Sequence, residues 1–362
     1  MRVKLEYVCE RGSSNLKQSD VVYSTGKYPV YGAAGHIGNV GFYHQEKPYV
    51  AVVKDGAGIG RTTICPAYSS VIGTMQYLLP KENVLPEYLC YVVRYMHLEK
   101  YFTGATIPHI YFKDYKNEQF NLDTLDKQEE IIDILGKCER IIAEKEREKL
   151  KLDNLIKARF VEMFGDPISN EKGWRTIEIS DACQRIIGGG TPSKSHSEYF
   201  EGSIPWVSPK DMKSDIITDS IDHITEEAIA NSTTNLVPVG SVLMVVRSGI
   251  LKHDLPVAIN AVQVTINQDM KAFVPGKGIT ASFLRNFFKA IESDVLSGVR
   301  KVTADNIDFK AFQQRQMIMP PISLQNEYET FCKQVDKSKV AVQKSLDETQ
   351  VLFDALMQKY FG

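Results

Sequence analysis

Several features that would place this chain in a common functional class are missing from its 362 residues. No run approaches the ~20 consecutive apolar residues that a membrane-spanning helix needs. The opening segment, Met1–Tyr7, carries charges where a secretion signal needs an apolar stretch. The six cysteines are scattered without a CxxC pair, as is typical of reduced thiols rather than of disulfides or a zinc site. The sequence therefore predicts a cytoplasmic protein that makes no contact with a membrane.

Catalytic motifs are also missing. The seven histidines show neither HExxH nor a close Cys/His spacing, and no serine lies in a nucleophile elbow. The (Asn/Asp)-Pro-Pro-(Tyr/Phe) tetrapeptide of amino-methyltransferases does not occur. Two glycine-rich stretches, at 55–60 and 188–195, lack the GxxxxGK[ST] spacing of a phosphate loop, so we interpret them as structural turns or DNA-facing loops. We expect no metal site, no bound cofactor and no enzyme activity in this chain.

What is present is an ordinary globular composition, with 43% hydrophobic and 24% charged residues. The length predicts about two or three domains. The net charge is −2, which gives no support for a nonspecific nucleic-acid binder. If DNA is a partner, the positive groups must be gathered locally, because neutralising phosphates depends on local charge.

The most informative feature is an internal repeat with an offset of 197 residues. Residues 106–165 align without a gap on residues 303–362, and eleven of these 60 positions are identical, including Gln128/Gln325 and Phe164/Phe361. Self-similarity at a fixed offset predicts a duplicated structural unit.

Each copy of the repeat ends in a long amphipathic pattern. Apolar residues recur every three or four positions over 128–163 and again over 325–360. A helix over 128–163 would be about 54 Å long at ~1.5 Å per residue, which suits a spacer. We expect the two helices to pair with each other or to dock another subunit. The residues predicted to do so are Ile131, Leu135, Ile142, Leu152, Ile156, Tyr328, Val335, Val342, Leu346 and Phe353.

Polar residues interrupt both apolar seams. Lys145 and Lys149 fall in the first seam, and Lys339 and Thr349 fall in the second. They oppose apolar residues at the equivalent places of the other copy, as expected if two different helices pair. Two ordinary amphipathic helices on a globular core remain the alternative interpretation.

Ahead of each helix lies a region of short strands and turns. Strand-like runs at 49–53 and 75–80 have counterparts at 241–249 and 270–275. The helices predicted to follow them cover residues 86–101 and 280–297. This order predicts an α+β fold with a mixed or mainly antiparallel sheet in each half.

The order of these elements and several short motifs carry a family resemblance. The motifs are Lys27–Gly35, Gly189–Ser193, Ile204–Met212 and Met319–Gln325. Together with the repeat, they make the whole chain resemble the DNA-specificity subunit of type I restriction–modification systems. One departure is Asn121–Leu125, which lacks the double proline that the second copy has.

The resemblance implies four segments. They are a first target-recognition domain (1–124), a long helix (125–165), a second target-recognition domain (166–319) and a second long helix (320–362). Each domain would read one half of an asymmetric, bipartite double-stranded DNA site. The two helices would pair as an antiparallel coiled coil with pseudo-twofold symmetry and set the half-site spacing.

The resemblance also implies the partners. Two methylation subunits would dock on the helices, and restriction subunits would join through the complex. S-adenosylmethionine and ATP with magnesium are expected on these partner subunits.

For DNA contact, the candidates are basic residues beside glycine-containing loops, because arginine can grip guanine with two hydrogen bonds and lysine can meet phosphate. They are Lys27, His36, Lys54, Arg61, Lys194, Lys210, Arg247, Lys252, Arg300 and Lys301. For any one of them, a solvated surface charge is the alternative. Two other functions remain open, namely a self-sufficient DNA methyltransferase and a coiled-coil assembly protein without a DNA role.

Overall fold

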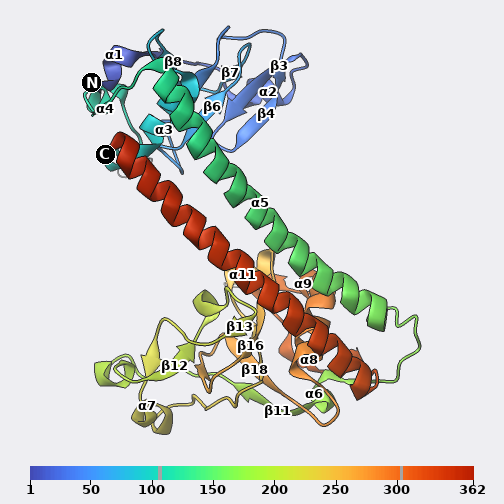
Figure 1. Ribbon diagram of the computed structural model, residues 1–362. Coiled ribbons are helices and arrows are strands. Elements are labelled where there is room, and N and C mark those ends of the chain that lie inside the picture. Colours follow the sequence, from blue (N-terminus) through green and yellow to red (C-terminus); the bar gives the residue numbers. More distant parts are fainter. Residues whose placement is uncertain (105–107, 302–304) are drawn as a thin grey trace. The chain divides into compact units, whose positions relative to one another are not determined.

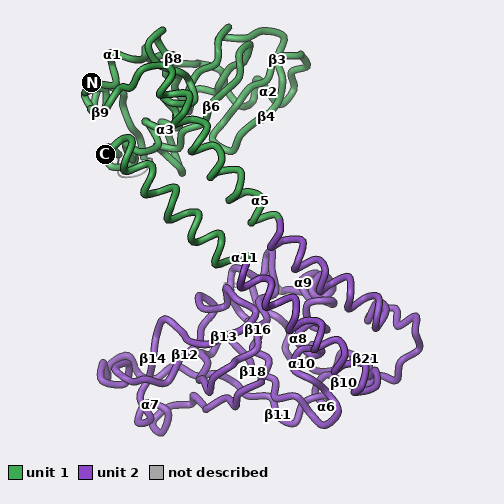
Figure 2. Tube along the Cα trace, in the orientation of Figure 1, with its two compact units in different colours: residues 1–147, 342–362 green, residues 148–341 purple. Residues whose placement is uncertain are grey.

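The computed structural model describes residues 1–104, 108–301 and 305–362, and the side chains of Arg300 and Lys301 lie outside this description. The chain divides into two compact units (Figure 2). Unit 1 consists of residues 1–147 and 342–362, and unit 2 consists of residues 148–341. Two helices of 40 residues, α5 (Leu125–Phe164) and α11 (Ile322–Phe361), contribute one segment to each unit. Among the described residues, no helix is long and apolar enough to cross a membrane.

Unit 1 is built on a four-stranded antiparallel sheet in the order β2-β8-β5-β6. A smaller sheet, β4-β3-β7, contains one parallel pair, β3 with β7. The strands are β1 (Arg2–Lys4), β2 (Cys9–Ser13), β3 (Tyr28–Gly32), β4 (Gly35–Val40), β5 (Tyr49–Val53), β6 (Thr62–Cys65), β7 (Ser70–Val71), β8 (Met75–Pro80) and β9 (Gln119–Asn121). The helices are α1 (Leu5–Val8), α2 (Gln18–Val22), α3 (Pro86–Tyr95), η1 (Leu98–Tyr101) and α4 (Phe112–Tyr115).

Unit 2 repeats this plan with a larger main sheet. The order is β11-β18-β15-β16-β13, and a second sheet, β14-β12-β17, again contains one parallel pair. The strands are β10 (Thr176–Glu178), β11 (Cys183–Gly188), β12 (Ile204–Val207), β13 (Ile216–Ile217), β14 (His223–Ile224), β15 (Val242–Val245), β16 (Val257–Asn260), β17 (Thr265–Ile266), β18 (Met270–Pro275), β19 (Arg300–Lys301), β20 (Asp305–Asn306) and β21 (Gln316–Ile318). The helices are α6 (Ile179–Ala182), η2 (Ser197–Phe200), η3 (Pro209–Asp211), α7 (Glu226–Ala230), η4 (Gly249–Lys252), α8 (Ala281–Ala290), α9 (Glu292–Ser297) and α10 (Phe309–Gln313).

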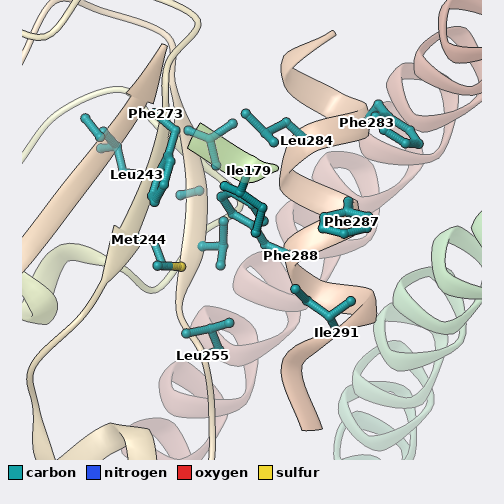
Figure 3. Close-up of a cluster of buried hydrophobic side chains, with 14 of the residues drawn as sticks. Ile179, Leu243, Met244, Leu255, Phe273, Phe283, Leu284, Phe287, Phe288 and Ile291 are labelled. Atoms are coloured by element: carbon teal, nitrogen blue, oxygen red, sulfur yellow. The ribbon is translucent and has the colours of Figure 1, made fainter. Parts of the chain in front are cut away.

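One helix covers the main sheet of each unit. In unit 2, Phe283, Leu284, Phe287 and Phe288 of α8 enter the same buried cluster as Phe273 of β18 (Figure 3). In unit 1, α3 packs in the same way on β5 and β6 (Figure 1). Both faces of the central strands are therefore apolar, as the fully buried run of β5 indicates. The prediction of an α+β fold with mixed, mainly antiparallel sheets is confirmed.

The covering helices are shorter than the sequence predicts. The predicted helix over 86–101 is wrong beyond Tyr95, because His97 takes a left-handed backbone (φ 51°) and the chain continues as η1. The predicted helix over 280–297 is divided at Ile291 into α8 and α9. A single residue outside the right-handed helical region is enough to interrupt the i→i−4 hydrogen bonding.

The long helices pair within unit 2 in antiparallel fashion. The Tyr328 hydroxyl donates to the Ile156 carbonyl (3.3 Å), and the Lys339 ammonium lies 2.6 Å from the Asp153 carboxylate. Residue numbers thus rise along α11 as they fall along α5. In unit 1, residues from both helices enter one core, including Leu135 of α5 and Met357 of α11. The predicted coiled-coil pairing and internal repeat are confirmed.

A buried glutamine attaches the start of α5 to the rest of unit 1. The Gln128 Nε2 donates to the carbonyls of Asn83 (3.0 Å) and Asp123 (2.9 Å), and its Oε1 accepts from the Leu85 amide (2.8 Å). The side chain is fully buried. These bonds join the long helix to the loop that begins α3.

The equivalent glutamine makes the same three bonds in unit 2. The Gln325 Nε2 donates to the carbonyls of Gly278 (3.0 Å) and Pro320 (2.9 Å), and its Oε1 accepts from the Thr280 amide (3.0 Å). Gln325 is also fully buried. The identity of Gln128 and Gln325 in the sequence repeat is therefore explained by one shared anchoring geometry, which we call the glutamine anchor.

Candidate nucleic-acid interface

The predicted DNA-contacting residues of unit 1 fall in two places. Lys54 and Arg61 flank the glycine-rich turn after β5, which is closed by a bond from the Val53 amide to the Arg61 carbonyl (2.9 Å). His36 belongs to β4 of the smaller sheet and bonds Asn39 (2.8 Å), and Lys27 directly precedes β3 and lies over the Tyr28 ring. All except Lys54, which is half-buried, are exposed.

The glycine-rich turn has a backbone explanation. Gly56, Gly58 and Gly60 all have positive φ values, between 81° and 95°. Residues with a Cβ rarely adopt this conformation, so the glycines are needed for the turn itself. The interpretation as a structural turn requires no bound nucleotide.

In unit 2, the structure brings several of the predicted basic residues together. Arg247 forms an isolated bridge with Asn306 of β20, and the Lys252 ammonium lies 3.8 Å from the Asp305 carboxylate. Arg300 and Lys301 form β19, which pairs with β20, although their side chains lie outside the described part of the chain. The backbone thus gathers four of the six candidates around β20.

The other two candidates of unit 2 lie elsewhere. Lys194 is exposed in the turn between β11 and η2. Lys210, in η3, pairs with Asp222 at 2.6 Å, and this hydrogen bond raises the pKa of Lys210. The ion pair does not prevent phosphate contact, because an exposed pair is worth little in water.

A pocket of about 250 Å³ lies in unit 1 beside the end of β5. Its polar lining includes Lys54, Gln76 and His109, and its apolar lining includes Ile110 and Phe112. The remaining lining residues are Arg11, Ser13 and Tyr111. We call this the unit 1 pocket.

Unit 2 has a pocket of about 400 Å³ at the same place in its fold. It is lined by Arg247, Lys271, Asn306, Ile307 and Phe309. Val246, Gln268 and Asp308 complete the lining. We call this the unit 2 pocket.

Backbone contacts establish that the two pockets are equivalent. The Ile110 amide donates to the Lys54 carbonyl (2.9 Å), and the Ile307 amide donates to the Val246 carbonyl (3.0 Å). The next residues along each strand form matching isolated bridges, Asp55 with His109 and Arg247 with Asn306. Each pocket therefore lies just beyond the end of a central strand of the main sheet, β5 or β15. There the chain contacts the segment that leads into the long helix.

One polar atom of the unit 1 pocket has no hydrogen-bond partner among the residues that the structure describes. Gln76 is 3% exposed, and its Nε2 is a buried donor without an acceptor. Nearby, the His109 imidazole pairs with the Asp55 carboxylate. Because a buried, unpaired N–H costs roughly 1–3 kcal/mol, this donor suits a ligand or water that offers an acceptor.

A half-buried ion cluster connects the long helices to the residue before β13 and to α8 in unit 2. Asp215 pairs with Arg285 and, at 2.7 Å, with Lys339, which also pairs with Asp153 of α5. Burial tends to raise the pKa of Asp215, but the two cations more than offset it and the pKa is lowered. Lys339, which interrupts the apolar seam in the sequence, is therefore the centre of a charge network rather than a defect in packing.

The ten residues predicted for helix pairing are all buried or half-buried. Ile131, Leu135 and Phe353 belong to the core of unit 1 or pack against it. Leu152, Ile156, Tyr328 and Val335 do so in unit 2. Ile142, Val342 and Leu346 complete the set along the paired helices. Seven of the ten therefore belong to, or pack against, a core to which both long helices contribute.

The described residues contain no group of three or more His, Cys, Asp or Glu side chains that could hold a metal ion. Five of the six cysteines are buried, and burial raises the pKa of Cys90 and Cys332 to about 11 and that of Cys9 to about 12. Such thiols are poor nucleophiles at neutral pH.

The sequence did not identify Arg11, Gln76, His109 and Lys271 as site residues. Only the shared identities Ile110/Ile307 and Phe112/Phe309 marked these places in the repeat. A signal was available, because those apolar identities precede the long helices and line both pockets. These identities mark the apolar residues that line each pocket, and they do not identify the polar residues that line it as well.

Comparison with known proteins connects both halves to one family. The type I restriction modification DNA specificity domain matches residues 1–152 and again residues 171–349. The specificity subunit of the Escherichia coli type I restriction enzyme EcoR124I/EcoR124II is 37% identical over 217 residues, covering 58% of this chain and 51% of that protein. The specificity subunit of the MjaIX enzyme of Methanocaldococcus jannaschii is 32% identical over 121 residues, covering 33% of this chain and 27% of that protein. The matched segment thus spans about half or less of these relatives.

Solved structures share the fold over the full length. The type I restriction–modification S subunit from M. genitalium has a TM-score of 0.62 at 13% identity, covering 100% of this chain and 96% of that one. A chain from a structure on complex assembly and conformational transition of the type I R-M system has a TM-score of 0.55 at 16% identity, with coverage of 99% and 97%.

Proposed function

This chain belongs to the type I restriction modification DNA specificity family, and from that membership we propose that it is the DNA-specificity subunit of a restriction–modification complex. Each unit reads one half of an asymmetric, bipartite double-stranded DNA site. The chain itself is non-catalytic and acts in the cytoplasm. S-adenosylmethionine and ATP with magnesium bind the partner subunits.

The observation that carries the proposal is the double match of the family domain to a chain whose two units share a strand order, apart from the additional β13, and have equivalent pockets. Duplicated readers with different side chains suit two half-sites of different sequence. In functional terms we divide the chain into recognition domains at 1–124 and 166–319 and helices at 125–165 and 320–362.

In this proposal, DNA is contacted by exposed cations, by residues around the strand ends and by residues at the pockets. Lys27, Arg61, Lys194 and Lys210 are exposed cations that suit phosphate. His36, exposed beside the ring of Tyr31, and Lys252, together with Arg300 and Lys301, supply further contacts around the strand ends. Lys54 and Arg247 lie at the pockets.

Docking of the two methylation subunits uses the outer faces of the long helices. Leu155 and Leu352 are identical in the repeat and are 46% and 52% exposed. Ala158 and Ala355, three residues further on, are also identical and exposed. Because these residues are exposed, packing in the cores does not explain why they are identical. Two copies of one partner, each binding one helix, would require the same residues on both helices.

The test is selection from a random pool of double-stranded DNA by the full chain together with its methylation subunit. We expect enrichment of two different half-sites separated by a constant gap of unspecified bases. One continuous site would contradict the split readers, and no enrichment at all would contradict the function. Incubation of the chain alone with DNA and S-adenosylmethionine should transfer no methyl group.

A further inference from the structure

The two pockets combine an unchanging floor with a changing rim. Ile110 and Ile307 are buried, Phe112 and Phe309 are half-buried, and each pair is identical in the repeat. The other equivalent lining positions differ in every case. The pairs in which both residues line a pocket, unit 1 first, are Lys54/Val246, Gln76/Lys271, His109/Asn306 and Tyr111/Asp308. Arg247 lines the unit 2 pocket, and its counterpart Asp55 lies beside the unit 1 pocket, where it pairs with His109.

Both pockets present hydrogen-bond donors from the second residue of the same strand. In unit 1, this residue is Gln76 of β8, whose Nε2 lacks an acceptor. In unit 2, it is Lys271 of β18, whose ammonium lies 5.2 Å from the centre of the Phe309 ring. A residue with donor groups therefore lines each pocket at the equivalent position of the strand, but its chemistry differs.

The outer positions of both pockets can be reached from solvent, whereas Gln76 is 3% exposed. Tyr111 is 46% exposed, Arg11 and Asn306 are exposed, and the side chain of Arg247 is 48% exposed. The Arg247 guanidinium is held by Asp269, with its Nε 2.6 Å from the carboxylate, so its direction is set before any ligand arrives. Preorganised polar groups around an apolar floor are typical of a recognition site.

We infer that these two pockets are the base-selecting sites of the two units, and that the differing rim residues determine which bases each half-site contains. The inference rests on the proposed function. Gln76 and His109, with Tyr111 beside them, select in unit 1. Lys271, Arg247 and Asn306 select in unit 2.

The alternative ligand in the same DNA, a backbone phosphate, fits the rims less well. Phosphate is chemically the same in both half-sites, so a phosphate pocket would have the same rim in both units. Instead, an amide and an imidazole in unit 1 are replaced by an ammonium and an amide in unit 2. Glutamine and asparagine suit adenine, and arginine and lysine suit guanine, so the exchange changes the base that each rim can bind.

The test exchanges rims between the units in the full chain, assayed with the methylation subunit against a random double-stranded DNA pool. One variant carries Gln76→Lys with His109→Asn, and the other carries Lys271→Gln with Asn306→His. Each should change the selected bases in one half-site only and weaken binding to the original sequence by about 5- to 150-fold, the range for one good base contact. Lys277→Gln, an exposed lysine outside both pockets, is the matched control and should change neither.

Substitution of the buried Gln76 could prevent folding, so each double variant is accompanied by a single variant at an exposed position. These single variants are Tyr111→Asp in unit 1 and Asn306→His in unit 2. Unchanged base preference in these folded variants would overturn the inference. An equal loss on all sequences would also overturn it, because it would indicate phosphate contact. If the unsubstituted chain selected no sequence, the proposed function itself would fail.

Discussion

Removing the glutamine anchor of unit 2 should loosen the attachment of α11 to α8. In Gln325→Ala, the half-buried amide of Thr280 loses its acceptor, and the carbonyls of Gly278, which is exposed, and Pro320, which is buried, lose their donor. A buried backbone group left unpaired costs roughly 1–3 kcal/mol, and water can satisfy the groups that it reaches, so we predict a loss of about 2–4 kcal/mol.

The assay is urea unfolding combined with hydrogen exchange of residues 278–290. We expect a lower unfolding midpoint and faster exchange at the start of α8, while the segment around α3 in unit 1 keeps its protection. The equivalent variant in unit 1, Gln128→Ala, removes the bonds to Asn83, Leu85 and Asp123. It should speed hydrogen exchange at the start of α3 and leave the protection of α8 unchanged.

The matched control is Gln334→Ala, at an exposed position of the same helix. It should change stability by no more than about 0.5 kcal/mol, as is usual for surface substitutions. If Gln325→Ala were as mild as this control, the anchor would be a consequence of the fold and not one of its causes.

Three further predictions follow from the ion cluster, the exposed cations and the helix faces. Because the pKa of Asp215 is lowered in the folded protein, its carboxylate stabilises unit 2 at pH values above 3.8, the ordinary pKa, and this stabilisation is lost as the pH falls through the folded pKa. Asp215→Asn should therefore flatten the acid limb of a plot of stability against pH. An unchanged acid limb would contradict this. Lys194→Gln should weaken DNA binding equally on all sequences and reduce the slope of log K against log salt by about one; a sequence-dependent loss would exclude a phosphate contact. Leu155→Asp and Leu352→Asp should each reduce the bound methylation subunits from two to one, as measured by the mass of the complex, without lowering the melting temperature of the chain alone; two bound subunits in both variants would refute the docking faces.

The sequence predicted the repeated plan well, because the repeat and the amphipathic periods depend on local patterns. Apolar spacing predicts the long helices at 128–163 and 325–360, and in the structure they extend only a few residues further. The interruption of α3 at His97 was not predictable, because no sequence signal marks a histidine that adopts a left-handed backbone.

The candidate site was predicted less completely. Lys54 and Arg247 were identified from their places beside glycine-containing loops, and both line pockets. Gln76 was missed because nothing in a buried strand sequence shows that one amide donor lacks an acceptor. That property depends on the strands and loops that surround it in three dimensions.

The central proposal is that the chain contains two independent readers and that the paired helices set the spacing of the half-sites. It is tested most directly by inserting one heptad in α5 within residues 142–152 and another in α11 next to residue 341. Residue 341 is the last residue of unit 2 before the sequence returns to unit 1. Seven residues add about 10 Å, or roughly three base pairs, and nearly preserve the helical phase. Selection from random DNA should then return the same two half-sites with a longer gap. An unchanged gap, or altered half-site sequences, would contradict the account.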